Sequence, residues 1–92
     1  MKEALAKVWV NGRVQGVGFR FFVYQLTSRF GLNGIVKNLY DGQVYTEVEG
    51  DKEIIQAFLK ELKNGNRWSH VSAVNVEWKE YLGKYKNIEI TF

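Results

Sequence analysis

The chain of 92 residues contains no cysteine, no proline and a single histidine, and these scarcities exclude several kinds of chemistry. Without cysteine, a disulfide, a thiolate nucleophile, a zinc finger and an iron–sulfur cluster are all impossible. His70 is the one imidazole, and no paired acidic spacing of the EF-hand or zincin kind accompanies it. We therefore expect no metal site.

Long hydrophobic runs and blocks of one charge are also missing. No apolar stretch approaches the roughly 20 residues that cross a bilayer, so we expect no membrane-spanning segment. Residues 1–7 have neither a continuous apolar core nor a small-residue cleavage site, which predicts a cytoplasmic protein rather than a secreted one. The 13 basic and 10 acidic residues give a net charge of +3 without a basic run, so no nucleic-acid-binding arm is expected.

The sequence does contain a regular succession of strand and helix patterns. Apolar residues recur at every second position in the strand-like segments and at every third or fourth position in the helix-like ones. The length supports one core and nothing resembles a linker, so we expect a single domain over residues 1–92. The predicted elements are strands at 5–14, 33–39, 44–49, 74–78 and 88–92, and helices from Phe19 to the C-capping Gly31 and from the N-capping Asp51 to Asn64-Gly65.

This order, βαββαββ, is typical of an α+β ferredoxin-like sandwich with one additional C-terminal strand. In that fold two helices cover one face of an antiparallel sheet. A right-handed crossover makes the strands at 5–14 and 33–39 parallel, with the strand at 44–49 between them. The loop after the first strand and the end of the second strand then lie at the same edge of the sheet. The axes of these two strands are about 10 Å apart.

The loop Gln15-Gly16-Val17-Gly18-Phe19 joins the first strand directly to a helix. Its glycines can turn consecutive backbone N–H groups toward an anion, and a helix N-terminus favours negative charge. Arg20 adds a guanidinium that can donate paired hydrogen bonds to phosphate oxygens. Glycines alone suit any tight turn, and the loop is neither a Walker A motif nor a dinucleotide fingerprint. Together these residues predict a phosphate-binding cradle formed by Gln15, Gly16, Val17, Gly18, Phe19 and Arg20.

Two segments resemble the signatures of a known family. Residues 12–20, Gly12-Arg13-Val14-Gln15-Gly16-Val17-Gly18-Phe19-Arg20, resemble the signature of acylphosphatases, and residues 31–38 followed by Asp41-Gly42 and Val44 resemble its second signature. The resemblance covers the whole chain. It implies a ferredoxin-like fold, hydrolysis of the carboxyl-phosphate bond of acyl phosphates, and no cofactor. Carried over by position, it implies that Arg20 binds the phosphate and Asn38 positions the attacking water.

The predicted geometry favours the same pair, because Asn38 ends the second strand at the edge where the loop lies. An asparagine that only shapes the following turn is the alternative. Many members of the family have Thr directly after this Asn, whereas this chain has Leu39. The Asn38 side chain therefore has no hydroxyl group on the following residue to help orient it.

An acyl phosphate substrate also explains why no triad of Ser, His or Cys is needed. Its leaving group is a carboxylate whose conjugate acid has a pKa of about 4, so it departs without a general acid. Positioning and charge stabilisation can supply most of the catalysis of phosphoryl transfer. We expect the protein to be a monomer that binds this small molecule. We expect it to bind neither nucleic acid nor a membrane.

Two other functions compete with this hypothesis. A ferredoxin-like RNA binder would suit the aromatic content of 15%, but the third strand lacks the aromatic RNA-binding signature. A module of a larger maturation enzyme would carry further domains.

Several conspicuous side chains have simpler interpretations. Trp9, Trp68 and Trp78 are expected in packing or at the surface, and His70 away from the loop. Arg13 is a candidate for holding the loop, and Glu47 and Glu49 are expected to be solvated.

Overall fold

The structure is a computed structural model that describes residues 2–16 and 18–91, so Met1, Val17 and Phe92 lie outside the described residues. The elements follow in the predicted order βαββαββ. They are β1 (Glu3–Arg13), α1 (Phe19–Arg29), β2 (Asn33–Asn38), β3 (Val44–Asp51), α2 (Lys52–Asn64), β4 (His70–Glu80) and β5 (Ile88–Ile90). The main difference in bounds is β4, which begins at His70 and not at Val74.

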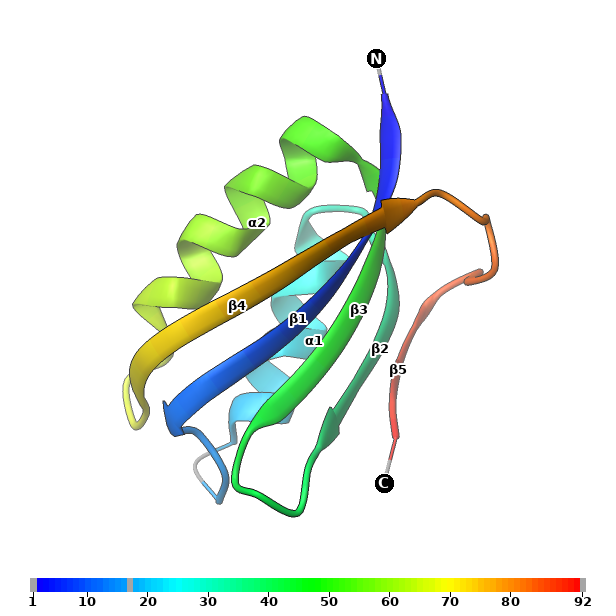
Figure 1. The fold of residues 1–92 in the computed structure, drawn as a ribbon. Coiled ribbons are helices and arrows are strands. Elements are labelled where there is room, and N and C mark those ends of the chain that lie inside the picture. Colours follow the sequence, from blue (N-terminus) through cyan, green and yellow to red (C-terminus); the bar gives the residue numbers. More distant parts are fainter. Residues whose placement is uncertain (1, 17, 92) are drawn as a thin grey trace.

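The five strands form one sheet in the order β4-β1-β3-β2-β5 (Figure 1). As predicted, β3 lies between β1 and β2 and pairs antiparallel with both. β4 pairs antiparallel with β1, whereas β5 pairs parallel with β2. The expected antiparallel sheet thus has one parallel pair at its edge and is mixed. The reason is topological, because residues 81–87 carry the chain from β4 to the opposite edge and deliver it in the direction of β2.

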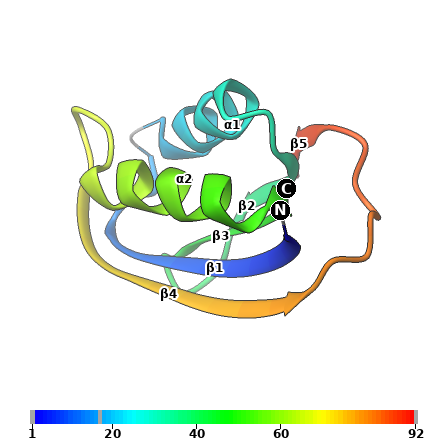
Figure 2. The same ribbon diagram turned by 90° about the horizontal axis from the view of Figure 1, so that it is seen from above.

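Both helices cover the same face of the sheet (Figure 2). Apolar side chains at three- and four-residue steps along each helix meet alternate side chains of the strands, and burial of this apolar surface drives folding. The fully buried members include Val8, Val10, Val36 and Val48 from the sheet, Phe19 and Val23 from α1, and Ile55, Phe58 and Leu62 from α2.

The opposite face of the sheet carries two acidic side chains that are not solvated. Glu47 is 8% exposed and Glu49 is 3% exposed, so the expectation of solvated carboxylates was wrong. Donors from residues 82–85 and two tyrosines satisfy these carboxylates. The path of the 81–87 connection over this face buries them, and strand alternation alone does not reveal that path.

Candidate active site

The loop between β1 and α1 has the backbone conformation that its glycines predict. Gly16 has φ 76° and Gly18 has φ 72°, in the left-handed region that other residues seldom adopt. A Cβ added to either glycine would meet nothing within 4 Å, so conformation and not crowding requires glycine there. Gly16 and Gly18 therefore both border open space.

Gly18 is the N-cap of α1, and no described side chain accepts a hydrogen bond from the first N–H groups of this helix. The first turn also contains no acidic residue. The first N–H groups of any helix lack partners within the helix and carry a partial positive charge. Among the described residues, the start of α1 therefore has neither a side-chain cap nor an acidic side chain of its own.

A pocket of about 280 Å³ lies at this loop. It brings together the glycines of the loop, the first turn of α1, the end of β2 and one residue of β5. Its lining residues are Val14, Gly16, Gly18, Phe19, Arg20, Phe21, Asn38 and Ile90. Arg20 and Asn38 are 18 positions apart in the sequence, and both are predicted site residues. The structure places them in the lining of one pocket. Ile90 was missed, because only the parallel pairing of β5 with β2 brings it there.

The Arg20 side chain is half-buried and contacts the end of the chain. Its Nη1 donates a hydrogen bond to the carbonyl oxygen of Thr91, at 3.3 Å. Thr91 follows β5, and its own N–H donates to the Val36 carbonyl in β2 at 2.8 Å. The C-terminal segment therefore fixes one side of the guanidinium.

The Gln15 side chain joins the loop to the turn that follows β2. Its Nε2 donates to the carbonyl oxygens of Leu39 and Gln43, at 2.7 and 2.8 Å. Sequence reasoning placed Gln15 in the cradle without foreseeing this contact. The side chain ties the loop to the strand end that carries Asn38, so the two halves of the pocket are held together.

Asn38 is the last residue of β2 and pairs with Val44 in β3. The turn beyond it closes with a hydrogen bond from Leu39 N–H to the Gln43 carbonyl, at 2.8 Å. Asp41 stabilises the turn by accepting from the Gln43 backbone N–H and side chain. These two hydrogen bonds, the backbone one first, lower the pKa of Asp41.

The remaining predicted residues differ in how far the structure describes them. The Phe19 side chain is 1% exposed and packs in the core against Phe22, so only its backbone can serve a ligand. Val17 lies outside the described residues. His70 is exposed at the start of β4, opposite Arg13 in β1, and does not line the pocket. Arg13 makes an exposed contact of 3.5 Å with the Trp68 carbonyl.

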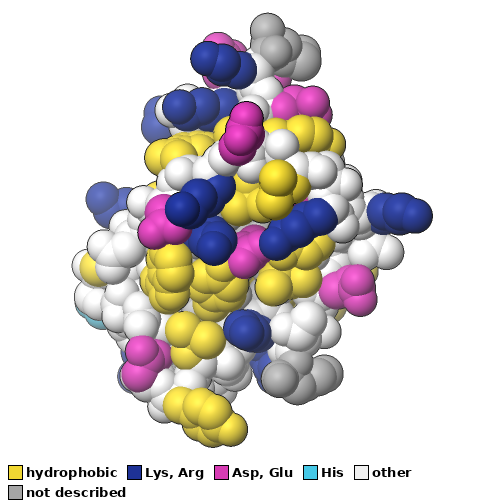
Figure 3. All heavy atoms as spheres, turned by 45° about the vertical axis from the view of Figure 1, so that its right-hand side comes forward, with side chains coloured by type: hydrophobic (Ala, Val, Ile, Leu, Met, Phe, Trp, Pro, Cys, Tyr) yellow, Lys and Arg dark blue, Asp and Glu magenta, His cyan; other side chains and the backbone are white. Residues whose placement is uncertain are grey.

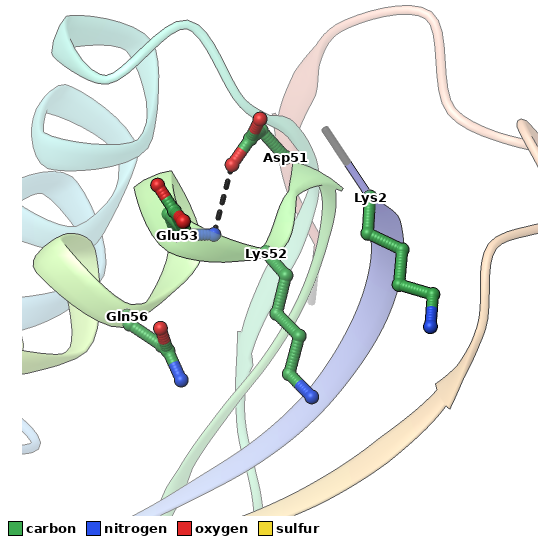
Figure 4. Close-up of a pocket in the computed structure, with 5 residues that line it drawn as sticks. All are labelled: Lys2, Asp51, Lys52, Glu53 and Gln56. Carbon is green, nitrogen blue, oxygen red and sulfur yellow. Dashed lines mark hydrogen bonds between the residues drawn. The ribbon is translucent and has the colours of Figure 1, made fainter.

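A larger hollow of about 660 Å³ lies at the N-terminus of α2, lined by Lys2, Asp51, Lys52, Glu53 and Gln56 (Figure 4). Asp51 caps this helix, and its carboxylate accepts from Glu53 N–H at 2.8 Å and from Ile54 N–H at 3.3 Å. The donors that an anion would need are therefore occupied by an acidic side chain of the chain itself. Volume alone does not make this hollow the better candidate.

Among residues 2–16 and 18–91, no group of three or more His, Asp or Glu side chains could hold a metal ion. None of the described helices has the length and hydropathy to cross a membrane.

By its fold, the chain is a small α+β domain of the ferredoxin-like class, with a pocket at its first strand-to-helix loop. The sequence profile described as Acylphosphatase matches residues 6–90 of this chain. The chain therefore belongs to the acylphosphatase family of enzymes.

Individual relatives agree with this assignment. The chain is 44% identical over 81 residues to an acylphosphatase of Caldanaerobacter subterraneus subsp. tengcongensis, covering 88% of this chain and 90% of the relative. It is similar to the crystal structure of an acylphosphatase from Bacillus subtilis, with a TM-score of 0.93, 36% identity and coverage of 97% and 99%. Full-length HypF, in a crystal structure of its phosphate- and nucleotide-bound form, contains a similar region. There the TM-score is 0.86 at 32% identity, over 99% of this chain and 12% of the HypF chain.

Proposed function

We propose that the chain hydrolyses acyl phosphates to a carboxylate and inorganic phosphate, with the β1–α1 loop and Arg20 binding the phosphate and Asn38 positioning the water. The observation that carries this proposal is the single pocket that Gly16, Gly18, Arg20 and Asn38 line together. Family membership supports the reaction, and the pocket geometry supports the roles of the residues.

The phosphate oxygens accept hydrogen bonds from the backbone N–H groups of residues 15–20 at the start of α1. Arg20 adds charge-assisted hydrogen bonds, which are shorter and stronger than neutral ones. Donors that are fixed before the reaction stabilise developing charge without reorganisation during the step. The hydrogen bonds of Arg20 to the Thr91 carbonyl and of the Gln15 side chain to the Leu39 carbonyl support such a fixed arrangement.

The Asn38 amide orients a water molecule toward the phosphorus atom. A bond forms between the water oxygen and phosphorus, and the bond between phosphorus and the acyl oxygen breaks with its electrons passing to the carboxylate. The proton that the water loses is accepted by a phosphate oxygen. Because a carboxylate with a conjugate-acid pKa of about 4 leaves unprotonated, the reaction requires no general acid. We also propose that it proceeds without a metal or a cofactor.

We propose that the protein is active as a monomer, since Arg20 and Asn38 of the same chain line one pocket. RNA binding is disfavoured by the sheet face that ferredoxin-like RNA binders use for base stacking. In this chain that face carries Glu47 and Glu49, whose carboxylates are buried beneath the 81–87 connection.

Steady-state hydrolysis of benzoyl phosphate, in the presence of a metal chelator, tests the proposal. We expect turnover in the parent protein and a loss of kcat/KM of about a hundredfold or more in both Arg20→Ala and Asn38→Ala. Two exposed residues provide matched controls, Arg29→Ala and Asn75→Ala, which should retain full turnover. Undiminished turnover in either pocket variant, or dependence on added metal, contradicts the proposal.

A further inference from the structure

A carboxylate of β3 is enclosed by the backbone of the connection between β4 and β5. Glu49 Oε2 accepts from the N–H groups of Leu82 and Gly83, both at 2.9 Å. Glu49 Oε1 accepts from the N–H groups of Lys84 and Tyr85, at 2.9 and 3.2 Å. Four consecutive N–H groups thus converge on one side chain that is 3% exposed.

The neighbouring Glu47 reinforces this attachment. It accepts hydrogen bonds from the hydroxyls of Tyr45 and Tyr85 and forms an ion pair of 3.2 Å with Lys84. Burial alone would raise the pKa of Glu47, but the hydrogen bonds from Tyr45, Tyr85 and Lys84 hold it below its usual value. Figure 3 brings forward the side of the molecule that lies to the right in Figure 1, where acidic side chains lie between basic and hydrophobic ones. We call Glu47, Glu49 and the 82–85 segment the carboxylate clamp.

The clamp adds to the attachment of β5, which is short and lies at the edge of the sheet. β5 is an edge strand of three residues, Ile88–Ile90, paired only with β2 among the described strands. A strand this short is marginal without further support. Hydrogen bonds at its two ends complete its attachment, from Gly34 N–H to the Asn87 carbonyl at 2.9 Å and from Thr91 N–H to the Val36 carbonyl at 2.8 Å.

This short strand supplies two parts of the pocket. Ile90 lines it, and the carbonyl of Thr91, the next residue, accepts the hydrogen bond from Arg20 Nη1. The clamp itself is remote from the pocket. Glu49 pairs with Asn33 at the first residue of β2, whereas Asn38 is its last residue, about 17 Å further along the strand at 3.3 Å per residue. A direct effect of the Glu49 charge on the phosphate is therefore small at physiological ionic strength.

We propose that Glu49 is a positioning residue for Arg20. Its carboxylate fixes the 82–85 segment, and this segment sets the position of β5 along β2. The Thr91 carbonyl at the end of β5 then orients the Arg20 guanidinium toward the pocket. The inference rests on the phosphate-binding role proposed for Arg20, and Glu47 assists Glu49 by holding Tyr85 and Lys84.

The test compares Glu49→Gln with Glu61→Gln, whose carboxylate forms an exposed ion pair with Arg29 on the helical side. The glutamine amide replaces one acceptor oxygen with a donor that faces backbone N–H groups. For Glu49→Gln we expect the inhibition constant of inorganic phosphate to rise about tenfold and kcat/KM for benzoyl phosphate to fall by a similar factor. Glu61→Gln should change neither by more than about twofold.

A double-mutant cycle separates positioning from general loss of structure. Combined with Arg20→Ala, Glu49→Gln should cost less than about twofold in kcat/KM beyond Arg20→Ala alone, because its effect passes through the guanidinium. An equal loss in both backgrounds, or an unchanged phosphate inhibition constant in Glu49→Gln, overturns the inference. If Arg20→Ala alone retains full turnover, the proposed function fails first, which distinguishes the two failures.

If Glu49→Gln does not fold, Gly83→Ala provides the same test without removing the carboxylate. Gly83 has φ 65°, so a Cβ strains the segment that surrounds Glu49. We expect a smaller rise in the phosphate inhibition constant, of about threefold, that disappears when Arg20 is alanine. No rise in a folded Gly83→Ala protein overturns the inference.

Discussion

The two helices of this domain begin in different ways, although each is the next element after a strand. At α2, Asp51 occupies the N-cap and accepts from two of the first N–H groups, with Glu53 adding a second acidic side chain in the first turn. At α1, the N-cap is Gly18 in a left-handed conformation, and the first turn has no acidic residue. The basic side chain that follows Gly18 within the first turn is Arg20, which lines the adjacent pocket.

The difference shows that the backbone N–H groups at a helix N-terminus can serve either stability or ligand binding. Helix N-terminal N–H groups require an acceptor, and a side-chain carboxylate supplies it at a benefit of about 1 kcal/mol. Where the chain provides its own carboxylate, as at α2, the donors contribute to stability. Where it provides glycine and arginine instead, both residues line a pocket, and we propose that the donors there bind an external anion such as phosphate. The same applies to Glu49, whose carboxylate accepts from the N–H groups of residues 82–85 and so also serves stability.

The largest loss of activity is expected when the start of α1 is made to resemble that of α2. Gly18→Asp places a carboxylate beside the proposed phosphate site, and we expect kcat/KM for benzoyl phosphate to fall by about a hundredfold or more. Gly18→Asn is the matched control, because Asn and Asp both tolerate a positive φ better than other side chains do. It should lose clearly less activity, and equal losses would show that charge is not the cause.

Separating the loop from the strand end should have a smaller effect. Gln15→Ala removes both hydrogen bonds to the Leu39 and Gln43 carbonyls, so Asn38 is no longer held in a fixed position relative to the loop. We expect kcat to fall by about tenfold. Steady-state kinetics on Gln15→Ala and on Gln56→Ala, which alters an exposed glutamine of α2, check this expectation. If the two variants behave alike, the Gln15 contacts do not matter for the reaction.

The reverse change at α2 should affect stability and not activity. Asp51→Ala removes the cap, and we expect the free energy of unfolding to fall by about 1 kcal/mol. Asp51→Asn retains an acceptor and should lose less. Urea denaturation measures the stability, and benzoyl phosphate turnover of both variants should equal that of the parent. A loss of turnover in folded Asp51→Ala would mean that the hollow at α2 contributes to function.

The last expected effect appears only at high pH and concerns Glu47, whose carboxylate is satisfied within the chain as that of Asp51 is. Burial and the hydrogen bond to Glu47 raise the pKa of Tyr85 to about 12. A tyrosine whose pKa is raised on folding contributes stability that is complete below its unfolded value of about 10 and is lost as the pH rises through about 12.

Glu47→Gln should therefore lower the pKa of Tyr85 toward 10 and reduce the stability lost between about pH 10 and 12. Ultraviolet absorbance of tyrosinate follows the pKa, and urea denaturation at several pH values follows the stability. Glu61→Gln, which alters an exposed carboxylate of α2 that pairs with Arg29, serves as the control. Identical tyrosine titrations in the two variants would contradict the assignment of Glu47 as the cause.

Local patterns predict most of this fold. The alternation in β1 and β3, the three- and four-residue steps of the helices and the Asp51 cap all act between neighbours in sequence, so single-chain patterning reveals them. The parallel pairing of β5 and the burial of Glu49 were not foreseen, since both depend on where residues 81–87 cross the sheet. The pairing of Arg20 with Asn38 in one pocket followed from topology, whereas the contacts of Gln15 and Ile90 required the actual positions of a turn and an edge strand.

We propose that an external phosphate takes at α1 the place that the Asp51 carboxylate takes at α2. A crystal structure of the protein with inorganic phosphate tests this claim directly. We expect phosphate at the backbone N–H groups of residues 15–20, hydrogen-bonded to Arg20 and facing the Asn38 amide. Phosphate bound instead beside Lys2 and Lys52 at the start of α2, with none at the α1 loop, would contradict it.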